Sequence, residues 1–196
     1  MDSENTPPSP TRLRVLAAAR ACFSRDGFHG ASMKNICKAS EISPGTLYHH
    51  FPSKEALVEA IIEEDQLRAF SRFAQDKPDS DLVETIVNNL LAVREEDRAQ
   101  RALVVEIMAE GMRNPLVAEM LDRKHQAIMA MIESRLRQAQ QQGAVAADLD
   151  LPATSSLLLS LTYGILADTA TGSALSEAQR RRALSAMING VLRPVG

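Results

Sequence analysis

The sequence has no tryptophan, and aromatic residues make up only 4% of its 196 residues. Alanine and leucine dominate instead, which favours helices over strands. The two cysteines, Cys22 and Cys37, form no CxxC pair and fit no zinc module, and two thiols are too few for a disulfide scaffold. Both fall on apolar helical faces. We therefore interpret them as small buried side chains of a protein in the reducing cytoplasm.

The patterns of secretion, membrane insertion and catalysis are also missing. Residues 1–10 are polar and rich in proline, which predicts a disordered tail rather than a signal peptide. The most apolar stretch, Leu157 to Leu166, is too short and too polar to span a bilayer. No Gly-rich phosphate loop, HExxH or nucleophile elbow occurs. The adjacent His49 and His50 would point ~100° apart on a helix, so they are poor metal co-ligands. We expect no enzyme, cofactor or metal site.

The charge is small in total but unevenly distributed. The net charge is −3. Residues 1–54 contain seven Lys or Arg against four Asp or Glu, which is +3, and the rest of the chain is −6. A basic N-terminal part could meet phosphates while the acidic remainder keeps the protein in solution.

Helical periodicity extends along the sequence, and breaks at Gly, Pro, Asn and Asp divide it. We predict an all-α protein of about nine helices. The predicted helices cover residues 11–27, 32–38, 43–51, 54–75, 81–97, 99–113, 115–142, 151–171 and 176–192. Asp76 to Asp81 is predicted to be a loop.

Two short helices joined by a tight turn and braced by a third describe a helix-turn-helix. Its second helix, residues 43–51, is expected to enter the major groove. Leu47 and Phe51 would face inward. The opposite face would hold a glycine that allows close approach and side chains that can donate to phosphates. Serines 32, 43 and 53 are predicted N-caps beside free backbone N–H groups.

The run GFHGASMKNICKASEISPGTLYHHFPSKEAL, residues 27–57, resembles the DNA-binding signature of the TetR family of bacterial regulators. The upstream VLAAARACFSRDG resembles that family's first helix. The resemblance implies contacts mainly to phosphates, with Pro44 and Gly45 nearest the bases. The candidate DNA-binding residues are Ser32, Lys34, Ser43, Pro44, Gly45, Thr46, Tyr48, His49 and Lys54.

Some of these residues have plainer interpretations. Tyr48 could be partly a packing residue, and Lys34 could belong to a solvated face. Two positions also depart from the family pattern. Glu41 stands where the family commonly has a turn glycine, which predicts slight strain and weaker attraction for phosphates, and Cys37 replaces a usual alanine.

Beyond residue 60 the sequence resembles the TetR family in the arrangement of its predicted helices and only weakly in individual residues. This resemblance implies a helical bundle with a small-molecule pocket, whose last two helices, 152–171 and 176–192, form a four-helix bundle in a homodimer. The first of these is almost uncharged, so it must be buried in the core or against a partner. The expected domains are a tail at 1–10, a helix-turn-helix domain at 11–54 and a ligand-binding and dimerisation domain at 55–196.

Polar or soft residues on apolar faces are the candidates for the pocket, although methionine at helical spacing is more often ordinary core and His125 could be solvated. These candidates are Phe70, Met108, Met112, His125, Met129, Thr162 and Tyr163. The sequence thus predicts a cytoplasmic homodimeric repressor that is released from a palindromic double-stranded DNA operator by a mainly apolar small molecule, with no membrane partner. A DNA-binding regulator controlled by a partner protein, or without a ligand, is the alternative.

Overall fold

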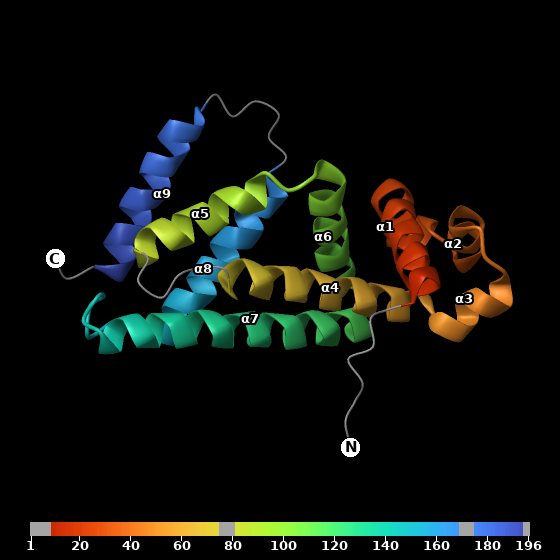
Figure 1. Ribbon diagram of the computed structural model, residues 1–196, viewed down its shortest axis with the longest axis horizontal. Coiled ribbons are helices and arrows are strands. Elements are labelled where there is room, and N and C mark those ends of the chain that lie inside the picture. The colour runs from red at the N-terminus through yellow and green to blue at the C-terminus, as the bar shows by residue number, and fades with distance from the viewer. Residues whose placement is uncertain (1–8, 75–80, 169–174, 194–196) are drawn as a thin grey trace, which may run out of the picture. The chain divides into compact units, whose positions relative to one another are not determined.

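The computed structural model describes residues 9–74, 81–168 and 175–193 (Figure 1). Within these ranges the chain forms nine α-helices and no strand, which confirms the predicted all-α fold. The helices are α1 Pro10–Gly30, α2 Met33–Ser40, α3 Pro44–His50, α4 Lys54–Ala74, α5 Leu82–Arg94, α6 Arg98–Gly111, α7 Pro115–Gln141, α8 Leu151–Ala167 and α9 Glu177–Leu192. None of the described helices has the length and hydropathy needed to cross a membrane.

The helix starts follow from capping side chains. Serine or aspartate oxygens accept backbone N–H groups at the first turns of α1, α2, α3, α5, α8 and α9. Ser53 does the same for α4, where its Oγ accepts from the N–H of Ala56 at 3.2 Å. Such caps satisfy N–H groups that have no partner inside the helix. The predicted caps at serines 32, 43 and 53 are therefore confirmed.

The first helix breaks where the sequence predicts its end. Gly27 has φ 70° and ψ 172°, a conformation that favours glycine. One further turn then runs to Gly30 and closes when the N–H of Ala31 donates to the Gly27 carbonyl at 3.1 Å. The start lies at Pro10, with Ser9 as its cap. The rest of the predicted tail, residues 1–8, lies outside the described residues, as do residues 76–80 of the predicted loop.

The chain divides into two compact units. Unit 1 comprises residues 1–64 and 98–121, and unit 2 comprises residues 65–97 and 122–196. The predicted boundary at residue 54 thus lies inside unit 1, which continues into α4 as far as residue 64 and also contains α6, packed with α1. The assignment of DNA binding to residues 11–54 and of ligand binding to residues 55–196 concerns function and stays a prediction.

Each unit has its own apolar core. In unit 1 the core includes Phe23 and Leu47, and in unit 2 it includes Leu136 and Ile188, all at most 2% exposed. Cys22 and Cys37 are both free and lie in the unit 1 core, as predicted. Burial of the apolar faces against one another is what stabilises helices of these lengths.

Candidate nucleic-acid interface

A tight turn joins α2 to α3. The N–H of Ile42 donates to the Cys37 carbonyl at 3.4 Å, and the Cys37 thiol donates to the Ile42 carbonyl at 2.9 Å. Ser40 is buried, and its hydroxyl donates to the Ile36 carbonyl at 2.8 Å. These bonds fix the direction in which α3 leaves the turn. The pair of helices therefore has the layout of a helix-turn-helix.

Glu41 carries backbone strain in this turn. Its φ of 54° and ψ of 40° place it in the left-handed region, which costs a residue with a side chain roughly 1–2 kcal/mol. Its N–H donates to the Lys38 carbonyl at 3.3 Å and so closes the end of α2. The strain predicted at this position is confirmed, since a glycine would adopt the conformation without this cost.

The third helix presents one buried and one exposed face. Leu47 is fully buried and Phe51 is 2% exposed, so both face inward as predicted. Tyr48 is 52% exposed. Among the other candidates on this helix, Pro44, Gly45 and His49 are exposed and Thr46 is half-buried. The buried Leu47 and Phe51 thus hold α3 in place, with its other face exposed to solvent.

At the starts of α2 and α3, serine side chains are already hydrogen-bonded within the protein. The Ser43 Oγ accepts from the Thr46 N–H at 3.1 Å and lies 2.8 Å from the Thr46 hydroxyl. Ser32 accepts from the N–H of Asn35 at 3.1 Å. Both serines therefore shape the backbone of the exposed face, whatever else they contact. Lys34 is exposed on α2.

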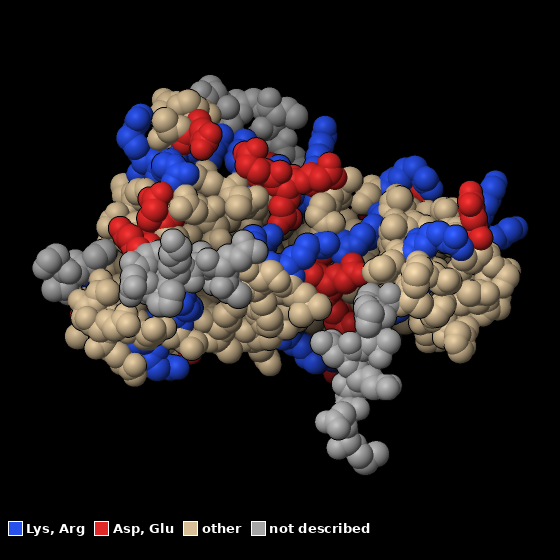
Figure 2. All heavy atoms as spheres, in the orientation of Figure 1, with Lys and Arg blue, Asp and Glu red and all other residues tan. Residues whose placement is uncertain are grey.

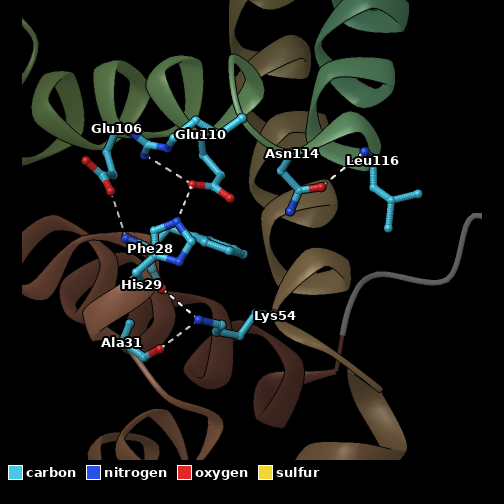
Figure 3. A network of polar contacts seen from close by, with 9 residues as sticks. Phe28, His29, Ala31, Lys54, Glu106, Glu110, Asn114 and Leu116 are labelled. Atoms are coloured by element: carbon cyan, nitrogen blue, oxygen red, sulfur yellow. Dashed lines mark hydrogen bonds and ion pairs between the residues drawn. The ribbon is translucent and has the colours of Figure 1, made fainter.

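Lys54 is engaged within unit 1. Its Nζ donates to the carbonyls of Phe28 and Ala31, at 2.8 and 3.1 Å, and lies 4.3 Å from the centre of the Phe28 ring (Figure 3). These contacts tie the start of α4 to the segment formed by the last turn of α1 and Ala31. The phosphate contact of Lys54 stays a prediction. Within the protein, the side chain stabilises unit 1 by its hydrogen bonds to the two carbonyls.

Two carboxylates of α6 hold the same segment (Figure 3). Glu106 accepts the backbone N–H of Phe28 at 2.8 Å. Glu110, only 2% exposed, lies 3.1 Å from the Nε2 of His29 and accepts from Arg113 at 3.2 Å. The segment that leads into α2 is therefore fixed from α4 on one side and from α6 on the other.

Formal charge lies beside α3 rather than on it. The sequence of α3 contains no Lys, Arg, Asp or Glu. In Figure 2 the surface over α3 is accordingly tan, while blue and red side chains gather over α1 and α2. A helix of this kind would read DNA through neutral donors and apolar contacts, with charged attraction supplied by its neighbours.

The predicted ligand residues divide between the units. Met108 and Met112 belong to unit 1, and Met112 is 89% exposed. The other five belong to unit 2. Of these, Phe70, Met129 and Tyr163 are partly buried against the unit 2 core. The structure thus gathers part of the predicted set in one unit and leaves Met112 on the surface.

His125 and Tyr163 are neighbours in unit 2. Their ring centroids are 5.0 Å apart. The Nε2 of His125 and the hydroxyl of Tyr163 are both buried and have no hydrogen-bond partner. Burial lowers the pKa of His125 and raises that of Tyr163, because it disfavours the charged form of each. Thr162 differs, since its hydroxyl donates to the Leu158 carbonyl at 2.8 Å.

Sequence profiles of known families cover both parts of the chain. The profile of bacterial regulatory proteins of the tetR family matches residues 15–61. The profile of the C-terminal part of BetI-type transcriptional repressors matches residues 80–193. The HTH-type transcriptional regulator UidR of Escherichia coli strain K12 is 52% identical over 192 residues, which are 98% of each chain.

The chain belongs to the TetR family of bacterial transcriptional regulators. It is a helix-turn-helix, DNA-binding regulator, as predicted. A solved structure of GusR from Salmonella enterica matches with a TM-score of 0.90 and 52% identity, over 96% of this chain and 98% of that one. The HTH-type transcriptional repressor AcnR of Corynebacterium glutamicum is 27% identical over 84% of this chain and 85% of its own.

Besides Glu110 in unit 1, sequence reasoning missed two buried charges in unit 2 of this TetR-family regulator. Lys124 is 7% and Asp65 is 9% exposed. Burial lowers the pKa of Lys124, and the Asp65 carboxylate opposes this shift. A signal was present, because Lys124 interrupts the apolar spacing of Leu121 and Ile128 on α7. Polar residues on such a face indicate a buried group that needs a partner.

Proposed function

We propose that this regulator is a repressor that binds a palindromic double-stranded operator as a homodimer and is released from it by a small molecule. The observation that carries the DNA-binding part is the exposed face of α3, held on the buried Leu47 and Phe51. Repression is supported by the match to the BetI-type repressor profile and by the name of AcnR. Such a regulator would work in the cytoplasm, where the chromosome lies.

On DNA, the N-terminal half of α3 would face base edges. Pro44 and Gly45 have no bulky polar group there, so the backbone can come close. Tyr48 and His49 are exposed and can donate to phosphate oxygens. Lys34 would add a charged phosphate contact from α2. Two such helices in a dimer would read half-sites ~34–36 Å apart.

DNA selected from a random pool by the full chain would give the operator, and gel-shift titrations at several salt concentrations would test the face. The double variant Tyr48→Ala, Lys34→Ala should weaken binding to every sequence and flatten the salt dependence by about 0.9 for each lost phosphate contact. Met112→Ala, at an exposed side chain directly after α6, is the matched control and should change neither quantity. Unchanged affinity in the double variant would mean that α3 does not face DNA.

The proposed dimer would use α8 and α9. Leu157 is 63% exposed on the nearly uncharged α8, and Met187 is 42% exposed on α9. Apart from the chain neighbours and the backbone of the same helix, no atom lies within 4 Å of a Cβ built at Gly164 or Gly190, so both helices have open surface there. Exposed apolar side chains on such a face favour a two-fold interface.

Leu157→Glu tests this interface, because it would bury a carboxylate between two chains at a cost of several kcal/mol. Leu67→Glu is a matched control, since Leu67 is 64% exposed on α4. Leu158 is unsuitable because it is 7% exposed and fills the core of its own chain. Light scattering should show monomers of the Leu157 variant and dimers of the control, with operator affinity lost only in the first. A monomeric wild-type protein at micromolar concentration would contradict the dimer.

A further inference from the structure

The buried polar atoms of His125 and Tyr163 require an explanation. They come from α7 and α8, their rings are 5.0 Å apart, and neither the imidazole Nε2 nor the phenol hydroxyl has a partner. A buried polar atom without a hydrogen bond lowers the stability of the fold. Two of them on neighbouring side chains are rare in a native core and mark a place where a further polar group fits.

Both side chains are neutral at neutral pH. Burial and the charge of Lys124 lower the pKa of His125, while burial and the charge of Asp65 raise that of Tyr163. Asp65 is itself ion-paired with Arg68. The pair therefore offers hydrogen bonds without net charge. Phe70 and Met129 lie partly buried in the same unit.

We infer that His125 and Tyr163 bind a hydroxyl group of the effector, so that the effector is a neutral alcohol or phenol with an apolar remainder. This inference rests on the proposed function, which supplies the effector. A hydroxyl both donates and accepts, so it can serve the Tyr163 hydroxyl and either tautomer of His125 at once. A quaternary ammonium ion offers these atoms no hydrogen bond. The two charges near the pair, Lys124 beside His125 and Asp65 beside Tyr163, are opposite in sign, so the surroundings favour neither an anion nor a cation.

The free protein gives the first test. Tyr163→Phe removes a hydroxyl that has no partner, so its melting temperature should equal or exceed that of the wild type. Thr162→Val is the control, because its hydroxyl does donate to the Leu158 carbonyl, and its melting temperature should fall. A fall of the Tyr163→Phe melting temperature as large as that of Thr162→Val would show that the phenol has a partner in the free protein, and would overturn the inference.

Binding of four small probes gives the second test. Benzyl alcohol, benzyl methyl ether, benzylamine and benzoate share a phenyl ring and differ in the group that would meet the pair. Titration calorimetry should show benzyl alcohol binding at least about tenfold more tightly than the ether, since a site built for a hydroxyl rejects the analogue that lacks its hydrogen. This preference should disappear in Tyr163→Phe and in His125→Leu. Tighter binding of the amine or of benzoate, equal binding of alcohol and ether, or binding of none would overturn the inference.

Operator binding separates this inference from the proposed function. Without probe, the wild type should bind the selected operator, because operator binding is proposed for α3 in unit 1 and probe binding for Tyr163 in unit 2. Loss of the alcohol preference with operator binding intact would overturn only the hydroxyl site. Absence of operator binding by the wild type would overturn the proposed function instead.

Discussion

The two units differ in how they treat buried polar groups. In unit 1 Glu106 of α6 and Lys54 of α4 hold the last turn of α1, where both bond to backbone atoms of Phe28, and Lys54 also bonds to the carbonyl of Ala31. In unit 2 the described residues include three buried side-chain atoms without a partner, on His125, Ser155 and Tyr163, whereas no such atom is found in the described part of unit 1.

This difference matches two different tasks. A DNA-reading surface must be in position before it meets DNA, because ordering it on binding would reduce affinity. A ligand site must instead leave hydrogen-bonding groups open until the ligand arrives, which lowers the stability of the free protein. The comparison therefore predicts that unit 1 loses stability when the contacts of Glu106 or Lys54 are removed, whereas unit 2 loses none when the unpartnered Tyr163 hydroxyl is removed.

The largest expected effect comes from the cores of the units. Leu47→Ala in α3 and Leu136→Ala in α7 both remove side chains that are at most 1% exposed. Each should lower the free energy of unfolding by about 2–5 kcal/mol, because each leaves a cavity. Chemical denaturation measures this loss, and gel shifts well below the melting temperature should show weakened operator binding only for Leu47→Ala. Equal weakening by both would contradict a separate function for the two cores.

The division of roles was partly readable from the sequence. The spacing of Leu47 and Phe51 and the serine caps predicted the buried face of α3, because helical periodicity and capping are local. The α6 carboxylates were not readable in this way. Glu106 contacts Phe28, which is 78 residues away along the chain, and no local pattern encodes that pairing. Periodicity also could not tell that Met112 faces solvent.

A smaller effect is expected at Glu106. Glu106→Ala would leave the N–H of Phe28 without its acceptor and should lower the free energy of unfolding by about 1–2 kcal/mol, with weaker operator binding. Glu106→Gln keeps an oxygen at that position and should lose less than half as much. Thermal and chemical unfolding of both variants would decide between the two. If alanine and glutamine cost the same, the negative charge rather than the accepted hydrogen bond would be what stabilises unit 1.

Lys54 sharpens the comparison because it has two candidate roles. Lys54→Met keeps much of the side-chain length and removes the ammonium group, so the carbonyls of Phe28 and Ala31 lose their donor. We expect a loss of about 1 kcal/mol in unfolding free energy with an unchanged salt slope of operator binding. The opposite result, intact stability with a slope reduced by about 0.9, would assign Lys54 to a phosphate.

The smallest effect concerns Glu41, the one residue of the helix-turn-helix whose side chain opposes its backbone. At φ 54° a side chain costs roughly 1–2 kcal/mol, and glycine would remove this strain. Glycine also gains about 0.4–1 kcal/mol of entropy in the unfolded chain. The strain exceeds the entropy, so Glu41→Gly should raise the free energy of unfolding by about 0.5–1 kcal/mol.

Glu41→Gln is the control, because it keeps a side chain at positive φ and removes only the charge. Both variants should bind the operator slightly more tightly at low salt, since each removes an exposed carboxylate near the phosphates. Denaturant unfolding should separate them. A stability gain shared by glutamine would show that charge repulsion within unit 1, and not the left-handed backbone, is what Glu41 costs the fold.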